Sequence, residues 1–174
     1  MEDNIFRYDL HKYLWINYVR GYSDKEIAFN HMLVEWRADN WSSNTEKEFY
    51  DAMFMNYCFA CSYAYKQYLA NLHTNKEDKD MCNFCPLTNT KIHNYTCCNG
   101  LYNQYVKLIT IQAVGDNIEH LRRVGIPEEY KEPFITLRDN MESLFRGVCN
   151  AIAEIPVNPG VLYMDVDGKI KEAF

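Results

Sequence analysis

Two residue types that build tight turns are scarce in this sequence, whose 174 residues include only 5 prolines and 7 glycines. A β-sandwich or a β-barrel needs many such turns, so their scarcity favours long helices. The sequence also lacks an apolar run long enough to span a bilayer, and its first residues lack the pattern of a secretory signal. We therefore expect no membrane insertion and a cytoplasmic location.

Positive charge is scarce as well. The 18 lysines and arginines are outnumbered by 24 aspartates and glutamates, which gives a net charge of −6 at pH 7. The only tight basic cluster is Arg122-Arg123. Because phosphate binding needs clustered cations, the sequence argues against nucleic acid as a partner. An acidic protein can instead approach the basic surfaces with which other proteins hold nucleic acid.

Catalytic signatures are missing too. No glycine-rich phosphate loop occurs, and His11 and His31 have no serine or cysteine partner that the sequence identifies. Glu119-His120 is one histidine beside one carboxylate on an amphipathic segment, which is usually a surface feature. We therefore expect a protein that is not an enzyme.

Apolar and aromatic residues at helical spacing are abundant. A first helix is expected from Phe6 to Tyr18, and a second after the capping box Ser23-Asp-Lys-Glu26. One long third helix is expected from Phe49 to Tyr68, with Asn44 or Thr45 as its cap and with Cys58 and Cys61 along its apolar stripe. The clearest periodicity, from Phe134 to Ile155, predicts the last helix, with Cys149 in the core.

The end of the sequence predicts a small hairpin. Asp167-Gly168 lies between two β-prone segments, and this explains the acidic pair Asp165 and Asp167 better than a calcium loop does. The expected fold is therefore mostly α: a single-domain helical bundle over 1–174 with a zinc-clamped loop and a short C-terminal β-hairpin. Within it we expect N-terminal helices over 1–71, the cysteine-rich loop over 72–100, C-terminal helices over 101–156 and the hairpin over 157–174.

The most informative motif is a pair of Cys-x-x-Cys knuckles. Six of the seven cysteines fall between residues 58 and 98, and 20 residues separate the knuckle Cys58-Phe-Ala-Cys61 from the knuckle Cys82-Asn-Phe-Cys85. Four thiolates at this spacing are typical of a closed tetrahedral zinc site, which is structural because it has no open position. The sequence thus predicts structural Zn²⁺ bound by Cys58, Cys61, Cys82 and Cys85.

Other interpretations of these cysteines stay open. A second ligand set combines Cys82 and Cys85 with His93 and either Cys97 or Cys98. The first pair, Cys58 and Cys61, could instead be small buried residues of a helix stripe. A redox role is disfavoured because the βαβ context that usually accompanies such a motif is missing.

The cysteine frame also carries a family resemblance. The segment from Cys58 to Ala64, the segment Cys82-Asn-Phe-Cys85-Pro86-Leu87 and a cysteine ahead of Leu101-Tyr102 resemble small cysteine-knuckle proteins of tailed bacteriophages. The aromatic N-terminal helix and Ile152-Ala-Glu-Ile155-Pro156 fit the same pattern. The family has no assigned activity, and the resemblance implies a phage origin and an intracellular bacterial setting.

Together these observations predict a non-enzymatic, zinc-stabilised protein-binding module whose partner is a host or phage protein. One variant is an anti-CRISPR-like inhibitor of a host defence nuclease, in which an acidic surface blocks a basic nucleic-acid groove. The alternative is a zinc-dependent nucleic-acid-binding regulatory protein, which requires a basic patch despite the net charge.

Overall fold

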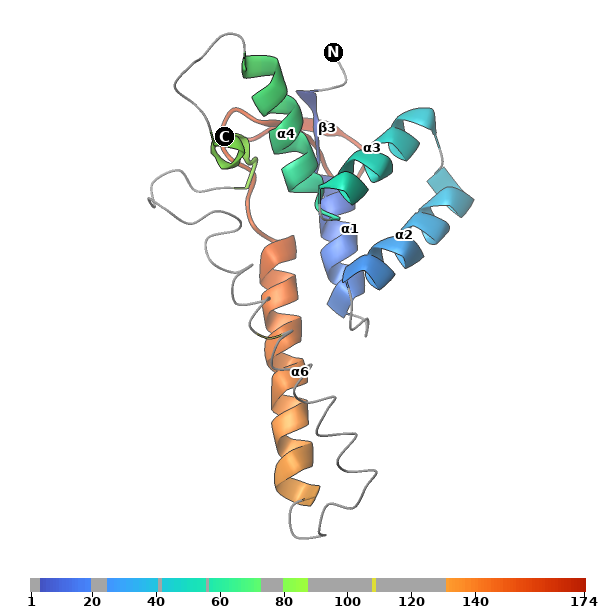
Figure 1. Ribbon diagram of the computed structural model, residues 1–174, viewed down its shortest axis with the longest axis vertical. Helices are drawn as coiled ribbons and strands as arrows, with labels where there is room; N and C mark the ends of the chain where they lie inside the picture. The colour runs from blue at the N-terminus through green and yellow to red at the C-terminus, as the bar shows by residue number, and fades with distance from the viewer. Residues whose placement is uncertain are drawn as a thin grey trace.

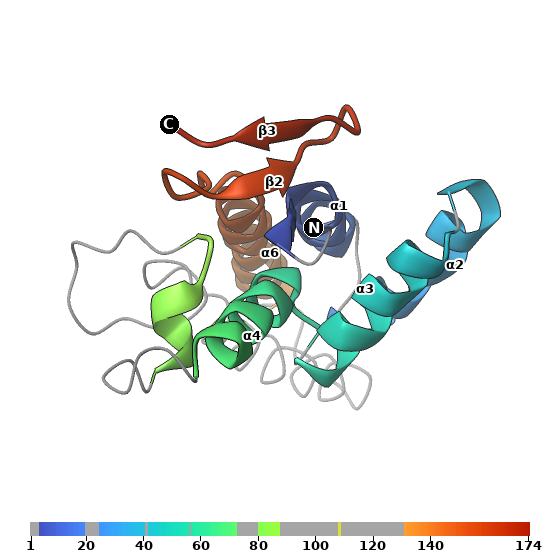
Figure 2. The ribbon, with the colours of Figure 1, turned by 90° about the horizontal axis from the view of Figure 1, so that it is seen from above.

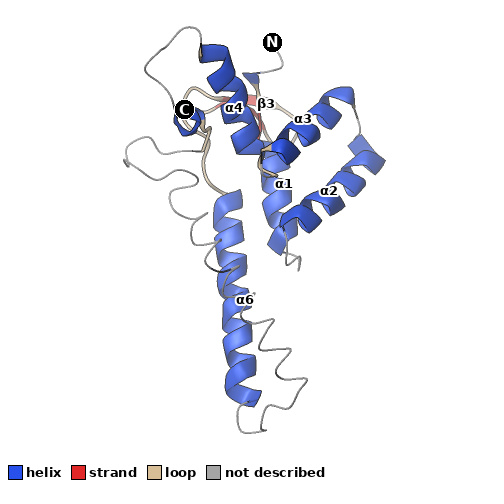
Figure 3. Ribbon diagram, viewed as in Figure 1, coloured by secondary structure: helices blue, strands red, loops and turns tan. Residues whose placement is uncertain are grey.

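Helices make up most of the described chain (Figure 3). The computed structural model describes residues 4–19, 25–40, 42–55, 57–72, 80–87, 108 and 131–174. Among these residues, no helix is both long and apolar enough to cross a membrane. The elements in chain order are β1 (Phe6–Arg7), α1 (Tyr8–Val19), α2 (Lys25–Asn40), α3 (Ser43–Phe54), α4 (Phe59–Asn71), η2 (Met81–Phe84), α6 (Lys131–Ala153), β2 (Leu162–Met164) and β3 (Ile170–Glu172).

The last helix was predicted correctly, and with α1 it forms the main helix pair of the fold. α6 lies beside α1, and the chain continues from its C-terminal end to the sheet (Figure 1). Cys149 and Ile152 are completely buried on the face toward α1, so the predicted core position of Cys149 is confirmed. The Tyr8 hydroxyl donates a hydrogen bond to the carbonyl oxygen of Ile155 at 2.9 Å, and Lys12 pairs with Glu154 at 2.9 Å.

The predicted C-terminal hairpin is confirmed and belongs to a three-stranded sheet. β2 pairs antiparallel with β3, and the turn between them uses Gly168 at φ 74°. β2 also pairs parallel with β1, where Phe6 lies opposite Tyr163. The sequence predicted a helix from Phe6, but residues 6–7 are a strand and the helix begins at Tyr8. In this sheet β2 lies beside α1, and β1 contacts α4 (Figure 2).

The long third helix predicted from Phe49 to Tyr68 is wrong, because the chain turns back between α3 and α4. Tyr57 takes a left-handed conformation (φ 55°) at the turn. Phe49 and Phe59 consequently both pack on Phe29, with ring centroids 5.3 and 5.8 Å from its own. In one continuous helix these two rings would be about 15 Å apart along the axis. Burying both phenylalanines in one cluster explains the break.

The start of α3 also differs from the prediction. The cap is Ser42, whose hydroxyl accepts a hydrogen bond from the backbone N–H of Thr45 at 3.2 Å. A side-chain oxygen at this position satisfies one of the free amides of the first turn. Thr45 itself is buried and lies in the helix. Ser23 of the predicted capping box and most of the predicted 72–100 loop lie outside the described residues.

Candidate functional site

Two of the four predicted zinc ligands lie together at the start of α4. Cys58 is the N-cap residue, with an extended backbone (φ −130°, ψ 111°), and its carbonyl oxygen accepts the Ser62 N–H at 3.0 Å. Cys61 lies in the first turn of the helix, three residues after Cys58. Both cysteines are partly exposed. The pair therefore lies at a helix N-terminus, rather than along a buried helix stripe.

The surroundings of Cys58 favour an anionic sulfur. The hydrogen bond from Cys61 lowers the pKa of the Cys58 thiol far below its ordinary value, to about 5. Burial opposes this shift, whereas the Lys25 charge and the backbone amides of Cys61 and Ala60 add to it. Lys25 is itself buried, with its ammonium 5.1 Å from the centroid of the Trp15 ring.

The residues before Cys58 fix the entry to α4. Tyr57 has a left-handed backbone, which costs a non-glycine residue about 1 kcal/mol. Its ring contacts Phe29 at a centroid distance of 5.2 Å, and the Cys58 N–H donates to the carbonyl oxygen of Ala52 at 3.2 Å. These two contacts offset the cost and set the direction in which the helix starts.

The second knuckle lies in the short 3₁₀ helix η2. Asp80 caps it, since its carboxylate accepts the Cys82 N–H at 2.9 Å. Phe84 packs on Tyr68 of α4, with ring centroids 6.3 Å apart. Asn158 from the segment before β2 donates to the carbonyl oxygen of Cys85 at 3.0 Å. The knuckle is therefore held between α4 and the C-terminal segment, with Cys85 buried and Cys82 partly exposed.

The structure does not bring the two knuckles together as one ligand cluster. Among the described residues, no three His, Cys, Asp or Glu side chains lie close enough to hold a single metal ion. This part of the chain includes all four predicted ligands, Cys58, Cys61, Cys82 and Cys85. His93, Cys97 and Cys98 lie outside it. Zinc binding therefore stays a prediction.

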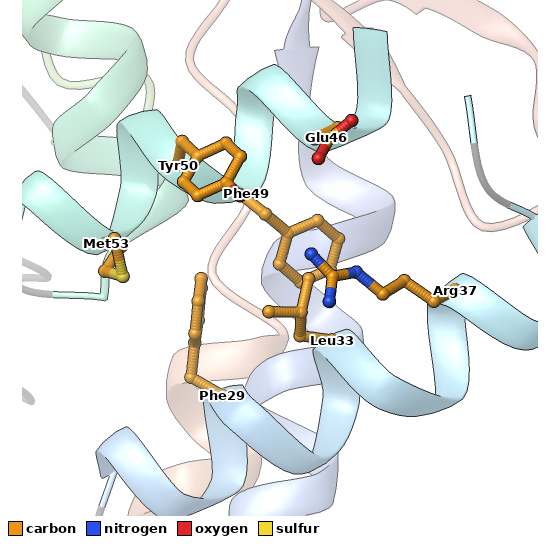
Figure 4. Close-up of a pocket in the computed structure, with 7 residues that line it drawn as sticks. All are labelled: Phe29, Leu33, Arg37, Glu46, Phe49, Tyr50 and Met53. Carbon is orange, nitrogen blue, oxygen red and sulfur yellow. The ribbon is translucent and has the colours of Figure 1, made fainter. Parts of the chain in front are cut away.

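A groove opens between α2 and α3. It is small and open to solvent, and its floor is formed by the buried rings of Phe29 and Phe49. Leu33 from α2 and Tyr50 and Met53 from α3 form its walls, and Arg37 and Glu46 lie at one end (Figure 4). The groove is apolar along its length and carries one charge of each sign at its end.

Large apolar side chains are exposed on α3, and two of them, Tyr50 and Met53, line this groove. Phe54 is 81% exposed, Tyr50 is 47% exposed and Met53 is 37% exposed. We define these three residues, with Phe29 and Leu33 of the groove, as the α2–α3 surface. Helical periodicity did not predict this surface, because Met53 falls on the same helical stripe as buried Phe49. Tyr50 and Phe54 are one and five residues after buried Phe49, and their apolar character outside the stripe was the available signal.

The acidic pair of the hairpin has a structural role. The Asp165 carboxylate accepts the Val166 N–H at 2.8 Å and pairs with Lys171, which also pairs with Asp167 at 3.5 Å. Lys171 lowers the pKa of Asp165. These contacts join the two arms of the turn, as the hairpin interpretation requires.

Comparison of the chain with known proteins finds no family, no curated protein and no solved structure that matches it.

Proposed function

We propose that this chain is a non-enzymatic, zinc-stabilised module that binds a protein partner through its α2–α3 surface. The observation that carries the proposal is the exposure of Phe54, Tyr50 and Met53 beside an apolar groove. Exposed side chains of this size that lie next to each other mark interaction sites, because burying them removes apolar area from water. Aromatic residues and methionine are also the side chains that interface centres favour.

The groove and the charge balance indicate the chemistry of the partner. An open groove with a phenylalanine floor can contact an apolar side chain of a partner, and Arg37 and Glu46 can orient polar groups at its end. The net charge of −6 favours a partner with basic surface around that side chain. The resemblance to phage proteins favours a host defence nuclease, whose nucleic-acid groove offers basic surface.

Zinc has a structural role in this proposal. Thiolates of Cys82 and Cys85 suit the ion chemically, and η2 is already anchored to α4 and to the segment around Asn158. Of the two ligand sets that the sequence left open, the one that joins this knuckle to His93 and either Cys97 or Cys98 is favoured. The support for this set is that, among the described residues, Cys58 and Cys61 do not form a group with Cys82 and Cys85 that could hold one metal ion.

The test compares two double variants of equal chemistry. Tyr50→Ser with Phe54→Ser removes exposed apolar side chains four residues apart on α3. Tyr65→Ser with Leu69→Ser removes exposed apolar side chains four residues apart on α4, where exposures are 42% and 44%. Both should keep the wild-type unfolding temperature, because surface substitutions change stability by less than about 0.5 kcal/mol.

Each protein is immobilised, and the proteins it retains from a bacterial lysate are quantified. We expect a partner that is lost with the α3 variant and kept with the α4 variant. The purified partner should then bind the wild type more tightly at low salt, as charge complementarity requires. Equal retention by both variants would exclude the α2–α3 surface. Direct binding of wild-type protein to a DNA duplex at low salt would instead support a nucleic-acid-binding regulator.

A further inference from the structure

We propose that the free edge of β3 binds an extended segment of a partner protein, which adds to the sheet as a fourth, antiparallel strand. The segment carries a basic residue opposite Glu172 and an apolar residue opposite Ile170. Neither of these two residues belongs to the α2–α3 surface, so the proposal does not depend on the proposed function.

β3 is an edge strand. Among the described residues the strand order is β1-β2-β3, so β2 is paired on both sides and β3 on one side only. The strand at the other edge, β1, contacts α4. Figure 2 shows β3 as the outermost strand, with β2 between it and α1. The backbone groups on the outer side of β3 therefore form a template for another strand.

The hydrogen bonds of the hairpin show which backbone groups of β3 face outward. The Ala173 N–H donates to the carbonyl oxygen of Val161 at 3.1 Å, and the Ala173 carbonyl oxygen accepts the Gly160 N–H at 2.8 Å. Ala173 thus directs both groups toward the first arm of the hairpin. Because successive residues of an antiparallel strand alternate in this respect, the N–H and C=O groups of Ile170 and Glu172 face the free edge.

Ile170 and Glu172 also place their side chains on the outer face of the sheet. Tyr163 of β2 faces α1, since its ring meets the Tyr8 ring edge-on at a centroid distance of 5.5 Å. Ile170 and Glu172 lie opposite the two neighbours of Tyr163 in β2, so their side chains point to the other face. Ile170 and Leu162 on that face are both exposed. A partner strand therefore meets apolar area beside one carboxylate.

Glu172 sets the charge that the added strand should carry. Lys171 pairs with Asp165 and, at 3.5 Å, with Asp167, and Lys169 also lies 3.5 Å from Asp167. In the described part of the chain Glu172 forms no ion pair. Opposite charges on paired strands stabilise a sheet, and the net charge of −6 attracts a basic segment.

A second copy of the chain does not fit this edge. When two copies of β3 pair antiparallel about a two-fold axis, outward-facing residues must lie opposite each other. Pairing Ile170 with Glu172 of the copy places Lys171 against Lys171. Pairing Glu172 with Glu172 opposes two carboxylates, and pairing Ile170 with Ile170 places Lys169 against Lys171. All three registers centred on β3 therefore oppose like charges, which is destabilising.

The test titrates the full, isotope-labelled chain with the capped peptide Thr-Thr-Lys-Thr-Val-Thr-Thr and follows backbone amides by NMR. In an antiparallel pairing its Lys lies opposite Glu172 when its Val lies opposite Ile170. We expect the amide signals of these two residues to shift, with a Kd of about 1 mM or tighter, and those of α3 to stay. A peptide with Glu in place of Lys should bind about fivefold more weakly.

N-Methylated peptides distinguish strand addition from simple attraction of charge. A methyl group on the Lys or the Val nitrogen removes a hydrogen bond to β3 and should abolish binding. A methyl group on the Thr nitrogen between them points away from β3, so this peptide is the matched control and should retain binding.

Two variants of the protein test the same contacts. Glu172→Lys should reverse the preference, so that the Glu peptide binds better than the Lys peptide. Glu132→Lys makes the same charge change at an exposed residue of α6 and should keep the wild-type preference. Ile170→Pro removes an outward N–H without removing a bond to β2, so it should lose peptide binding while its circular dichroism stays that of the wild type.

Three results would overturn the proposal. One is the absence of any shift at Ile170 and Glu172 at about 5 mM peptide, well above the expected Kd. The second is equal binding of the three N-methylated peptides. The third is a shift of the Ile170 and Glu172 signals with protein concentration alone, which would assign the edge to a second copy of the chain.

Discussion

The Nε2 atom of His11 lies 3.0 Å from the carbonyl oxygen of Ile152, so that a completely buried imidazole joins α1 to α6. A carbonyl oxygen can only accept, so Nε2 carries the proton and donates it. The ring also stacks on Tyr8, at a centroid distance of 5.9 Å. This histidine is therefore a structural residue of the main helix pair, and its charge state affects folding.

The pKa of His11 predicts a loss of stability in mild acid. Burial lowers this pKa from 6.5 to about 4. The positive charges of Lys25 and Lys12 also lower it, whereas the hydrogen bond with the Ile152 carbonyl oxygen raises it. Between these values the unfolded chain binds a proton that the folded chain does not. The free energy of unfolding should therefore fall by about 3 kcal/mol from this group as pH decreases from about 6.5 to about 4.

The measurement is urea unfolding of wild type and His11→Gln at several pH values. Glutamine can donate to the Ile152 carbonyl but does not titrate, so its unfolding free energy should fall less in this pH range. His31→Gln, at a residue that is largely exposed, is the control and should follow the wild type. A His11→Gln protein with the same pH dependence as wild type would contradict the prediction.

A second prediction concerns the Tyr8 hydroxyl, which donates to the Ile155 carbonyl at 2.9 Å in a buried contact. Tyr8→Phe keeps the ring and its edge contact with Tyr163 but leaves the carbonyl oxygen without this donor. We expect a loss of about 1–2 kcal/mol in the free energy of unfolding, measured by chemical denaturation. Tyr65→Phe, on the exposed side of α4, should change it by less than about 0.5 kcal/mol. If Tyr8→Phe and Tyr65→Phe change the free energy of unfolding equally, the Tyr8 hydrogen bond makes no net contribution to stability.

Lys66 provides a third prediction, because it ties α4 to α3. Its ammonium lies 2.9 Å from Glu48 and 3.0 Å from Asp51, with only 19% of its side chain exposed. Lys66→Met leaves two carboxylates facing each other, so we expect a loss of about 2 kcal/mol in unfolding free energy. Lys169→Met is the control, since Lys169 is 76% exposed and surface pairs contribute about 0–1 kcal/mol.

The triple variant Lys66→Met, Glu48→Gln, Asp51→Asn separates charge from packing. Removing the two carboxylate charges together with the cation should restore part of the lost stability. If the triple variant is as unstable as Lys66→Met, the lysine acts through its alkyl chain and the ion pairs are secondary.

The fourth prediction concerns zinc. The wild-type protein should contain stoichiometric zinc by metal analysis, and Cys82→Ser with Cys85→Ser should remove it. Cys58→Ser with Cys61→Ser should retain it. Because structural zinc supplies on the order of 10 kcal/mol of folding free energy in small sites, a chelator should destabilise the wild type strongly. Loss of zinc in both double variants would instead indicate that Cys58, Cys61, Cys82 and Cys85 bind the ion together. Wild-type protein without zinc would contradict the prediction of a zinc site.

Local signals explain what the sequence could predict. The α6 stripe has a 3.6-residue period over many turns, and the Asp167-Gly168 turn supplies the left-handed residue that a hairpin needs. The same period continues from Phe49 through Tyr68, yet the helix is interrupted between α3 and α4. Nothing local marks the break, because its cause is the shared contact of Phe49 and Phe59 with Phe29, which is distant in sequence.

The candidate site shows the same limit. The Cys-x-x-Cys spacing located the interesting cysteines, but it could not reveal that Cys58 begins a helix, because that depends on the break at Tyr57. It also could not show that Lys25, more than thirty residues earlier, would be near the sulfur. Spacing identifies which residues can act together, and tertiary contacts decide which of them do.

The pairing of Phe6 with Tyr163 has a consequence for the order of events during synthesis. The first strand and the first helix find their partners, β2 and α6, only in residues that are synthesised long after them. Until then the Phe6, Leu14 and Trp15 side chains, all buried in the finished protein, have no permanent cover from that side. Contacts this distant in sequence form slowly. The nascent chain should therefore depend on chaperones until β2 and β3 have emerged, and the pairing of β1 with β2 should be a late folding step.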